Sequence, residues 1–203
     1  MTNPALIPPN FERWFSERDW AILPHQLEMT TRYFRGESTL LTAPTGTGKT
    51  LSGFLPVLMD IARAKPTGIH TLYIAPLKAL SYDIERNVLA IIQALELEIS
   101  VEARTGDTGA AQRRRQREKP PQILLTTPES LMLLLSYHDA ADLFGQVECV
   151  IVDEIHQVAA SKRGDLVALA LAQLETYRPG FRRVGLSATV SDPDVFRAWL
   201  GPS

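Results

Sequence analysis

The sequence predicts an α/β protein whose mostly parallel sheet is covered by helices on both faces. Short β-rich runs alternate with helical stretches along most of the chain, and these runs are almost continuously apolar. Such strands are typical of a parallel sheet that is buried on both sides. In addition, polar clusters follow the runs at the points where the strands would end. Together these observations predict one open sheet with a ligand site along the carboxyl edge of its strands.

The length fits one sizeable globular domain, or at most two small ones, and the composition allows one good core. Apolar residues make up 45% of the 203 residues and charged residues 22%, as in ordinary globular chains. The formal net charge is −2, so any nucleic-acid site must be a local feature of the surface. Cys149 is the only cysteine, which excludes an internal disulfide and a cysteine metal cluster and suggests a small buried side chain. The chain shows neither a membrane-spanning apolar run nor a signal-peptide pattern, so we expect a cytoplasmic protein with no membrane partner.

Two short helices are expected before the first strand. Asn10 can cap a helix that places Phe11, Trp14 and Phe15 on one face. A second helix is expected over residues 24–34, and the glycine two residues later would end it. We expect most of these rings to belong to the core, although one of them could flank a nucleotide base.

Six β-rich runs follow in order, and a helix is expected after each of them. The runs span residues 38–42, 70–75, 99–104, 122–126, 147–152 and 183–186. The expected helices begin near Lys49, at Lys78, after Asp107, at Thr127-Pro128, near Asp165 and near Asp192. Proline is favoured at the first position of a helix, so Thr127-Pro128 is a well-defined helix start.

The turn after the first run has the pattern of a phosphate-binding loop. It reads Ala43-Pro44-Thr45-Gly46-Thr47-Gly48-Lys49-Thr50. The glycines allow a tight turn whose N–H groups, together with a helix N-terminus, favour an anion. Lys49 would reach the β- and γ-phosphates, and the Thr50 hydroxyl would hold Mg²⁺. The alternative is a glycine turn before an ordinary helix, and the Gly-Lys-Thr sequence in this context argues against it.

Two carboxylates follow the run over residues 147–152. Asp153 would hold Mg²⁺ through water, because Mg²⁺ prefers few carboxylates together with phosphate oxygens. Glu154 would orient or deprotonate the attacking water, and His156 could couple the γ-phosphate to a neighbouring strand. The alternative is a solvated acidic turn, but a phosphate loop upstream favours the hydrolytic interpretation.

The polar clusters are expected to meet along one edge of the sheet. They span residues 45–50, 76–78, 104–108, 126–130, 153–156 and 187–189. The basic run over residues 113–117 could contact a nucleic acid or form an ordinary solvated face. The helix start at Thr127-Pro128 is a better phosphate site, because its free N–H groups point outward. Phosphate contacts of this kind would be independent of sequence and sensitive to salt.

As a set, these motifs resemble those of superfamily 2 helicases. The resemblance rests on residues 24–26, 43–50, 75–80, 104–108, 126–131, 153–156 and 187–189. Alanine is usual at the first position of the phosphate loop in that superfamily, so Ala43 fits although the general pattern has glycine there. The motif sequences are closer still to those of the large helicase-related branch and, within it, to those of bacterial ligase-associated DEXH-box helicases. The match to that branch includes Ser161-Lys162-Arg163-Gly164-Asp165. The resemblance extends from Phe11 to Leu200.

The resemblance implies a RecA-like P-loop nucleotide-hydrolase fold and a role for each motif. Residues 1–36 would be a helical segment in which Gln26 reads adenine, and residues 37–203 would be the first RecA-like lobe. ATP would be bound by Gln26, Thr45, Gly46, Thr47, Gly48, Lys49 and Thr50, with Mg²⁺ on Thr50 and Asp153. Hydrolysis would be carried by Lys49, Asp153, Glu154 and His156. Nucleic acid would contact Pro76, Lys78, Arg104, Thr105, Gly106, Thr127 and Glu129. Ser187 and Thr189 would couple hydrolysis to strand movement through His156.

The implied function is that of the ATP-binding lobe of a 3′-to-5′ DNA helicase or translocase in DNA repair. Such proteins act on single-stranded DNA, unwind DNA or RNA–DNA duplexes, and need a second RecA-like lobe with an arginine finger. No arginine near the end of this sequence has that pattern, so we expect a fragment or excised lobe that binds ATP–Mg²⁺ weakly and hydrolyses it very slowly. A DNA ligase or nuclease is a possible partner by kinship. Two alternatives stay open, an RNA helicase lobe and a nucleotide-switched binding module without motor output. Glu154 argues against the second, because a switch needs no hydrolytic carboxylate.

Overall fold

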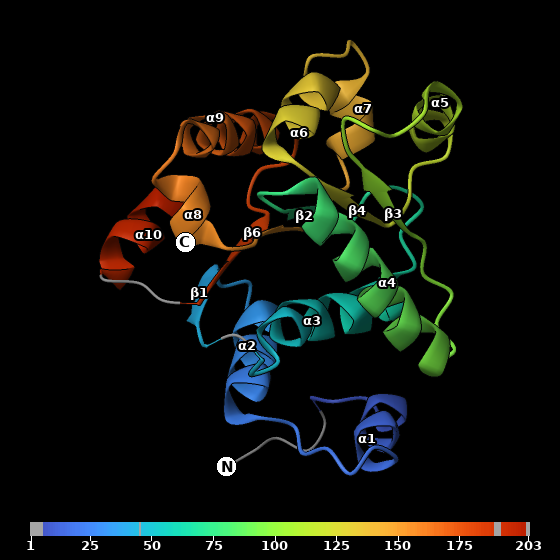
Figure 1. Cartoon of the computed structure of the whole chain (residues 1–203). Coiled ribbons are helices and arrows are strands. Elements are labelled where there is room, and N and C mark those ends of the chain that lie inside the picture. Colours follow the sequence, from blue (N-terminus) through green and yellow to red (C-terminus); the bar gives the residue numbers. More distant parts are fainter. Residues whose placement is uncertain (1–5, 45, 189–191, 202–203) are drawn as a thin grey trace.

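The computed structural model describes residues 6–44, 46–188 and 192–201 (Figure 1). In this part of the chain, strands form a 6-stranded sheet in the order β1-β6-β5-β2-β4-β3. The strands are β1 (Thr39–Thr42), β2 (Thr71–Ile74), β3 (Val101–Arg104), β4 (Ile123–Thr126), β5 (Cys149–Val152) and β6 (Arg182–Ser187). All neighbouring strands in this order are parallel. Each predicted run is therefore confirmed as a strand of one parallel sheet.

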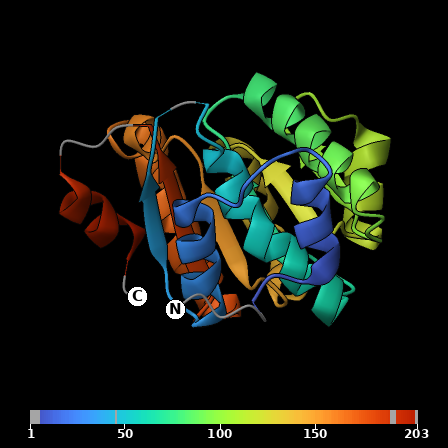
Figure 2. The same cartoon turned by 90° about the horizontal axis from the view of Figure 1, so that it is seen from below.

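Helices cover both faces of the sheet, as predicted. They are α1 (Pro9–Ser16), α2 (Pro24–Phe34), α3 (Lys49–Ala64), α4 (Lys78–Ala94), α5 (Ala110–Glu118), α6 (Pro128–Leu135), α7 (Ala140–Phe144), α8 (Ile155–Ala159), α9 (Lys162–Tyr177) and α10 (Pro193–Leu200). Helices α1 to α4 pack on one face, and α6 to α9 pack on the other (Figure 1). Figure 2 views the first face, with α1, α2 and α3 in front of the strands.

The N-terminal segment shares its core with the rest of the protein. Phe11 and Trp14 of α1 and Met29 and Tyr33 of α2 are buried in the same apolar cluster as Phe54 of α3. Most of the aromatic residues of this segment are thus core residues, as expected. Because residues from both parts belong to this one cluster, the core does not mark a boundary between them. The division at residue 36 therefore stays a prediction.

Several helix boundaries differ from the expectation. Helix α1 begins at Pro9, with Pro8 at the cap position, so Asn10 lies inside the helix and does not cap it. Proline is favoured there because its fixed φ suits the first turn and its missing N–H costs nothing. Helix α9 begins at Lys162 instead of near Asp165. The short helices α7 and α8 were not expected, since five residues carry too little periodicity to be recognised.

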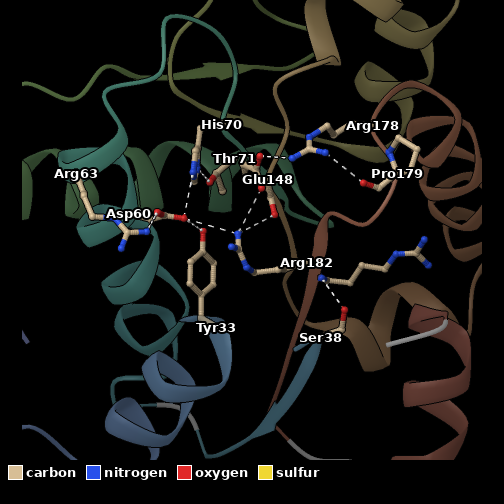
Figure 3. Close-up of polar contacts among 11 residues, drawn as sticks. Tyr33, Ser38, Asp60, Arg63, His70, Thr71, Glu148, Arg178, Pro179 and Arg182 are labelled. Atoms are coloured by element: carbon tan, nitrogen blue, oxygen red, sulfur yellow. Dashed lines mark hydrogen bonds and ion pairs between the residues drawn. The ribbon is translucent and has the colours of Figure 1, made fainter. Parts of the chain in front are cut away.

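A polar network ties α2, α3 and the sheet together at the amino ends of β2 and β6 (Figure 3). The buried Tyr33 hydroxyl donates a 2.9 Å hydrogen bond to Oδ2 of Asp60 in α3. His70 Nε2 lies 3.5 Å from the same oxygen, and Arg182 Nη1 lies 3.7 Å from it. The Arg182 guanidinium also stacks over the Tyr33 ring, 4.3 Å from its centroid. The network therefore lies at the opposite edge of the sheet from the predicted ligand site.

The same network determines the protonation of its central carboxylate. Burial alone would raise the pKa of Asp60, but hydrogen bonds from His70 and Tyr33 and the charge of Arg182 outweigh it and lower the pKa to about 2.

Cys149 lies nearby, and burial raises the pKa of its thiol to about 12. The prediction of a small buried cysteine is thus confirmed. None of the helices in the described ranges has the length and apolar character that crossing a membrane requires.

Candidate nucleotide and nucleic-acid site

The turn between β1 and α3 has the geometry of a phosphate loop. Gly46 and Gly48 have φ angles of +81° and +75°, in the left-handed region that side chains other than glycine rarely adopt. The Thr47 hydroxyl donates a 2.7 Å hydrogen bond to the Pro44 carbonyl and closes the turn. Lys49 is the first residue of α3, so the N-terminus of this helix lies directly behind the loop. Thr45 lies outside the described residues.

The segment before β1 supports this loop from behind. His25 Nε2 lies 3.1 Å from the Thr47 carbonyl. Gln26 is only 2% exposed, and its Oε1 accepts a 2.9 Å hydrogen bond from the Leu23 N–H. A Cβ added at Gly48 would lie 2.9 Å from Gln26 Nε2, so this glycine allows the amide to approach closely. The structure thus brings Gln26 to the phosphate loop, whereas its role in reading adenine stays a prediction.

The acidic pair lies at the carboxyl end of β5, two strands away from β1. Asp153 is buried, and Glu154 takes the left-handed conformation with φ 45° and ψ 46°. For a residue other than glycine this conformation costs about 1–3 kcal/mol. The turn places Glu154 Oε1 3.4 Å from Lys49 Nζ, and both side chains are largely shielded from solvent. The predicted meeting of Lys49 and Glu154 is therefore present in the structure, whereas the hydrolytic role of Glu154 stays a prediction.

His156 extends this arrangement to the next strand. Its Nδ1 lies 3.3 Å from Oε2 of Glu154 and 2.9 Å from the hydroxyl of Ser187 at the end of β6. Contacts therefore run without a break from Lys49 through Glu154 and His156 to Ser187. This is the path that the sequence predicts for coupling, and the coupling itself stays a prediction. Thr189 lies outside the described residues.

The Asp153 carboxylate is held on both of its oxygens. Oδ1 accepts a 2.9 Å hydrogen bond from the backbone N–H of Glu154, and Oδ2 accepts one from the hydroxyl of Tyr73. Burial raises the pKa of Asp153 above its usual range, although the hydrogen bond from Tyr73 and the charge of Lys49 act in the opposite direction. Tyr73 was not predicted from the sequence. Its signal is a phenol within a buried strand, but the partner of that phenol depends on β2 and β5 being neighbours.

The donor set at this edge fits Mg²⁺. Asp153 supplies a carboxylate and Thr50 a hydroxyl, and oxygen is the ligand type that Mg²⁺ prefers. Within the described residues, no group of three or more His, Cys, Asp and Glu side chains could hold a metal by itself. In addition, Oε2 of Glu154 is buried and lies 3.3 Å from His156 Nδ1.

Two of the predicted nucleic-acid residues are joined by an arginine of α9. Arg163 Nη1 donates a 2.9 Å hydrogen bond to the carbonyl of the buried Pro76, and its Nε lies 2.6 Å from Oε1 of the exposed Glu129. Lys78 is the first residue of α4, directly beyond Pro76. Thr127 is buried and caps α6, where its hydroxyl accepts a 3.4 Å hydrogen bond from the N–H of Ser130. These residues all lie at the same carboxyl edge as the phosphate loop.

The loop after β3 is tied to α5. Arg104 is only 3% exposed, and its Nη1 donates a 3.0 Å hydrogen bond to the Arg113 carbonyl. Arg113 in turn donates a 2.7 Å hydrogen bond to the carbonyl of Gly106. The N–H of the buried Thr105 donates to the Thr108 hydroxyl at 2.9 Å. Gly106 is exposed, so a ligand at this loop meets its backbone before it meets the Arg104 side chain.

The basic run of α5 is partly neutralised within the protein. Arg115 lies 2.7 Å from Glu102, and Arg117 lies 2.6 Å from Asp139. A pocket of about 440 Å³ nevertheless lies between α5 and the residues that follow α6. Its lining includes Arg104, Arg113, Arg114, Arg117 and Tyr137. Burial, and to a lesser extent the charges of Arg113 and Arg117, lower the pKa of Arg104, whose Nη2 has no hydrogen-bond partner among the described residues.

The fold and the site together define a RecA-like P-loop nucleotide-binding domain. A parallel sheet carries the phosphate loop after β1, the acidic pair after β5, and the His156–Ser187 contact between β5 and β6. Residues 23–197 match the family model described as DEAD/DEAH box helicase. The chain therefore belongs to the DEAD/DEAH box helicases, and this confirms the resemblance on which the residue assignments were based.

Similar proteins include helicases of the Lhr type. The chain is 41% identical to the Lhr helicase/probable uracil glycosylase of Mycolicibacterium smegmatis, over 92% of this chain and 13% of that protein. It is 38% identical to the ATP-dependent helicase Lhr-Core of Methanothermobacter thermautotrophicus, over 92% of this chain and 23% of that protein. The chain thus spans less than a quarter of the length of these two curated relatives.

Solved structures show the same fold in this family. The structure of Mycobacterium smegmatis helicase Lhr bound to ssDNA and AMP-PNP matches with a TM-score of 0.88 and 39% identity, over 95% of this chain and 26% of that one. The crystal structure of the DUF1998 helicase MrfA bound to DNA and AMPPNP matches with a TM-score of 0.86 and 27% identity, over 98% of this chain and 29% of that one. The RecA-like fold predicted from the sequence is therefore confirmed.

Proposed function

We propose that this chain is the ATP-binding motor lobe of a DNA helicase or translocase that moves 3′ to 5′ and acts in DNA repair. The observation that carries the proposal is the contact between Lys49 of the phosphate loop and Glu154 of the acidic pair. A phosphate-binding lysine and a carboxylate capable of activating water lie within one ion-pair distance. This is the pairing that nucleotide hydrolysis requires.

Each residue of the pair has a defined task in this proposal. Lys49 and the N–H groups of the loop hold the β- and γ-phosphates, which would compete with Glu154 for the lysine charge. Thr50 and Asp153 would hold Mg²⁺, which would supply positive charge to neutralise the phosphates. Glu154 accepts the proton of the attacking water. His156 transmits the state of this carboxylate to Ser187 and β6.

Nucleotide binding by the isolated chain tests this assignment. We expect a fluorescent ATP analogue to bind weakly in the presence of Mg²⁺, and we expect Lys49→Ala to abolish the binding. His138→Ala is a suitable control, because this residue lies in the α6–α7 connection and takes no part in the contacts of the phosphate loop given above. Equal binding by the wild type and Lys49→Ala would contradict the proposal.

The nucleic-acid surface is proposed to follow the carboxyl edge from Pro76 to Glu129. Support comes from relatives whose solved structures contain ssDNA or DNA together with an ATP analogue. The pocket beside Arg104 is lined by four arginines and two carboxylates, Glu118 and Asp139, so it carries net positive charge at the same end of β3. Contacts of this kind would be made to phosphates, so binding should weaken steeply as salt rises. Fluorescence anisotropy with labelled strands of one length measures this, and binding that is insensitive to salt would contradict it.

An RNA helicase lobe is the alternative within the same family. Competition between unlabelled DNA and RNA strands of equal length distinguishes the two substrates, and stronger competition by RNA would favour the alternative. A nucleotide-switched module without motor output would instead tolerate loss of the Glu154 carboxylate. The relative from Methanothermobacter thermautotrophicus is an ATP-dependent helicase by name, which favours the hypothesis of a motor lobe.

The isolated lobe is proposed to be nearly inactive without a second RecA-like lobe. An arginine finger is worth about 10³–10⁵ in turnover, and no arginine contacts the Lys49–Glu154 pair in the part of the chain described here. Rapid DNA-stimulated hydrolysis by this chain alone would contradict the proposal.

Partnership with a DNA ligase or nuclease, and a cytoplasmic location, rest on kinship and composition. Affinity purification and fractionation of cells that produce the protein would test them.

A further inference from the structure

A buried tyrosine of β2 lies next to the acidic pair that follows β5. Tyr73 is the third residue of β2 and is fully buried. Its ring stacks on Phe54 of α3, with ring centroids 5.1 Å apart and an interplanar angle of 22°. Interiors are close-packed, so a ring held between a helix and the sheet has little freedom to turn. The direction of the Tyr73 hydroxyl is therefore determined by the core.

That hydroxyl donates its hydrogen bond to Oδ2 of Asp153. The other carboxylate oxygen, Oδ1, accepts the backbone N–H of Glu154 at 2.9 Å. One donor comes from β2 and the other from the turn after β5, and these strands are neighbours in register, with Tyr73 opposite Ile151. Each carboxylate oxygen keeps further acceptor capacity. The carboxylate is thus oriented from two sides before any ligand arrives.

We propose that Tyr73 is a positioning residue for the Mg²⁺–nucleotide complex, because its hydroxyl holds the Asp153 carboxylate in the orientation that receives Mg²⁺-bound water. The inference rests on the nucleotide site proposed above and assigns a further residue to it. Groups that hydrogen-bond a metal-binding side chain fix its orientation, and their loss typically lowers metal affinity about 10–100-fold. Tyr73 does not touch the nucleotide or the metal; it acts through Asp153.

The alternative is that Tyr73 merely satisfies a buried polar group and contributes only to stability. The chain contains a matched control for this alternative. Tyr33 is also a buried tyrosine, and its hydroxyl donates to a buried aspartate, Asp60, at 2.9 Å. That pair lies at the opposite edge of the sheet (Figure 3). Tyr33→Phe and Tyr73→Phe therefore remove the same kind of hydrogen bond, in one case far from the nucleotide site and in the other beside it.

The experiment titrates Mg²⁺ into each protein at a fixed concentration of a fluorescent ATP analogue. We expect Tyr73→Phe to raise the Mg²⁺ concentration at half-saturation about tenfold, and we expect Tyr33→Phe to match the wild type. Binding of the analogue in EDTA should be the same for all three proteins, since Lys49 and the loop are untouched. An unchanged Mg²⁺ dependence for Tyr73→Phe, or an equal shift for both variants, would overturn the inference.

Two further measurements separate the possible failures. If the wild type shows no Mg²⁺-dependent binding and Lys49→Ala changes nothing, the nucleotide site itself is wrong and the inference falls with it. If Tyr73→Phe does not fold, the Tyr33→Phe protein provides a second readout, the ultraviolet difference spectrum of its tyrosines. We expect Mg²⁺ with the analogue to perturb that spectrum more than the analogue in EDTA, because the partner of the Tyr73 hydroxyl acquires a cation. Identical spectra in the two conditions would contradict the positioning role.

Discussion

Asp60 makes the stability of this fold depend on pH in a way that can be calculated. Its carboxylate lies at the centre of the network at the amino ends of β2 and β6, where it meets Tyr33, His70 and Arg182. The pKa falls from the ordinary value of 3.8 to about 2 in the folded protein. A folded-state pKa below the unfolded value means that the charged carboxylate stabilises the fold. This stabilisation is present above the unfolded pKa and is lost as the pH falls through about 2.

The difference between these pKa values corresponds to about 2.4 kcal/mol, at about 1.36 kcal/mol for each unit. Asp60 is only 6% exposed, so screening by solvent reduces this figure little. Between about pH 5 and about pH 3, the part that is lost amounts to about 1 kcal/mol. We therefore expect Asp60→Asn to be less stable than the wild type at the higher pH, and we expect the deficit to shrink by that amount at the lower pH.

Urea unfolding followed by circular dichroism measures both free energies at each pH. Asp83→Asn is the matched control, because Asp83 pairs with Arg86 on the surface of α4 and both side chains are largely exposed. Its effect should stay below about 0.5 kcal/mol at either pH. A deficit for Asp60→Asn that is the same at both values would refute the argument, since it would show that the carboxylate has a similar pKa in the folded and unfolded chains.

Two further predictions concern catalysis and helix packing. Glu154→Gln should keep nucleotide affinity within about twofold while it lowers the rate of hydrolysis at least about 100-fold. Both quantities are measured in a protein that includes the proposed second lobe. Undiminished turnover would show that Glu154 does not activate water. Gly164→Ala should lower the free energy of unfolding by about 1–3 kcal/mol, because a Cβ there would lie 2.7 Å from the Val158 carbonyl, whereas a Cβ at Gly109 meets nothing within 4 Å. Thermal unfolding of Gly164→Ala and Gly109→Ala measures this, and equal midpoints would contradict the packing argument.

The sheet and the phosphate loop could be predicted from local sequence because each carries its signal within a few residues. The strands that become β2, β4 and β5 are short, mostly apolar runs, and they are buried along their whole length. The phosphate loop can be recognised from Gly46 and Gly48, whose φ angles only glycine adopts readily. Because polar residues at the carboxyl ends of parallel strands converge, the meeting of Lys49 and Glu154 also followed from the fold class.

Other features depend on contacts between residues far apart in the chain. The bond from Tyr73 to Asp153 exists because β2 and β5 are neighbours, and the sequence contains no local signal of strand order. The burial of Arg104 under α5 has the same origin. The start of α1 was misplaced at Asn10, because a polar capping residue was preferred over the proline that actually begins the helix. Local patterns thus identified the site, and long-range packing determined how its side chains are held.

The central claim is that a nucleoside triphosphate binds in the loop before Lys49, close to Asp153 and Glu154. A crystal structure of this chain with a nonhydrolysable ATP analogue and Mg²⁺ tests it most directly. The account predicts phosphate density against the N–H groups of the loop and the Lys49 ammonium, with the metal between the phosphates and the Asp153 carboxylate. Phosphate density at any other place on the molecule, with this loop empty, would contradict the claim.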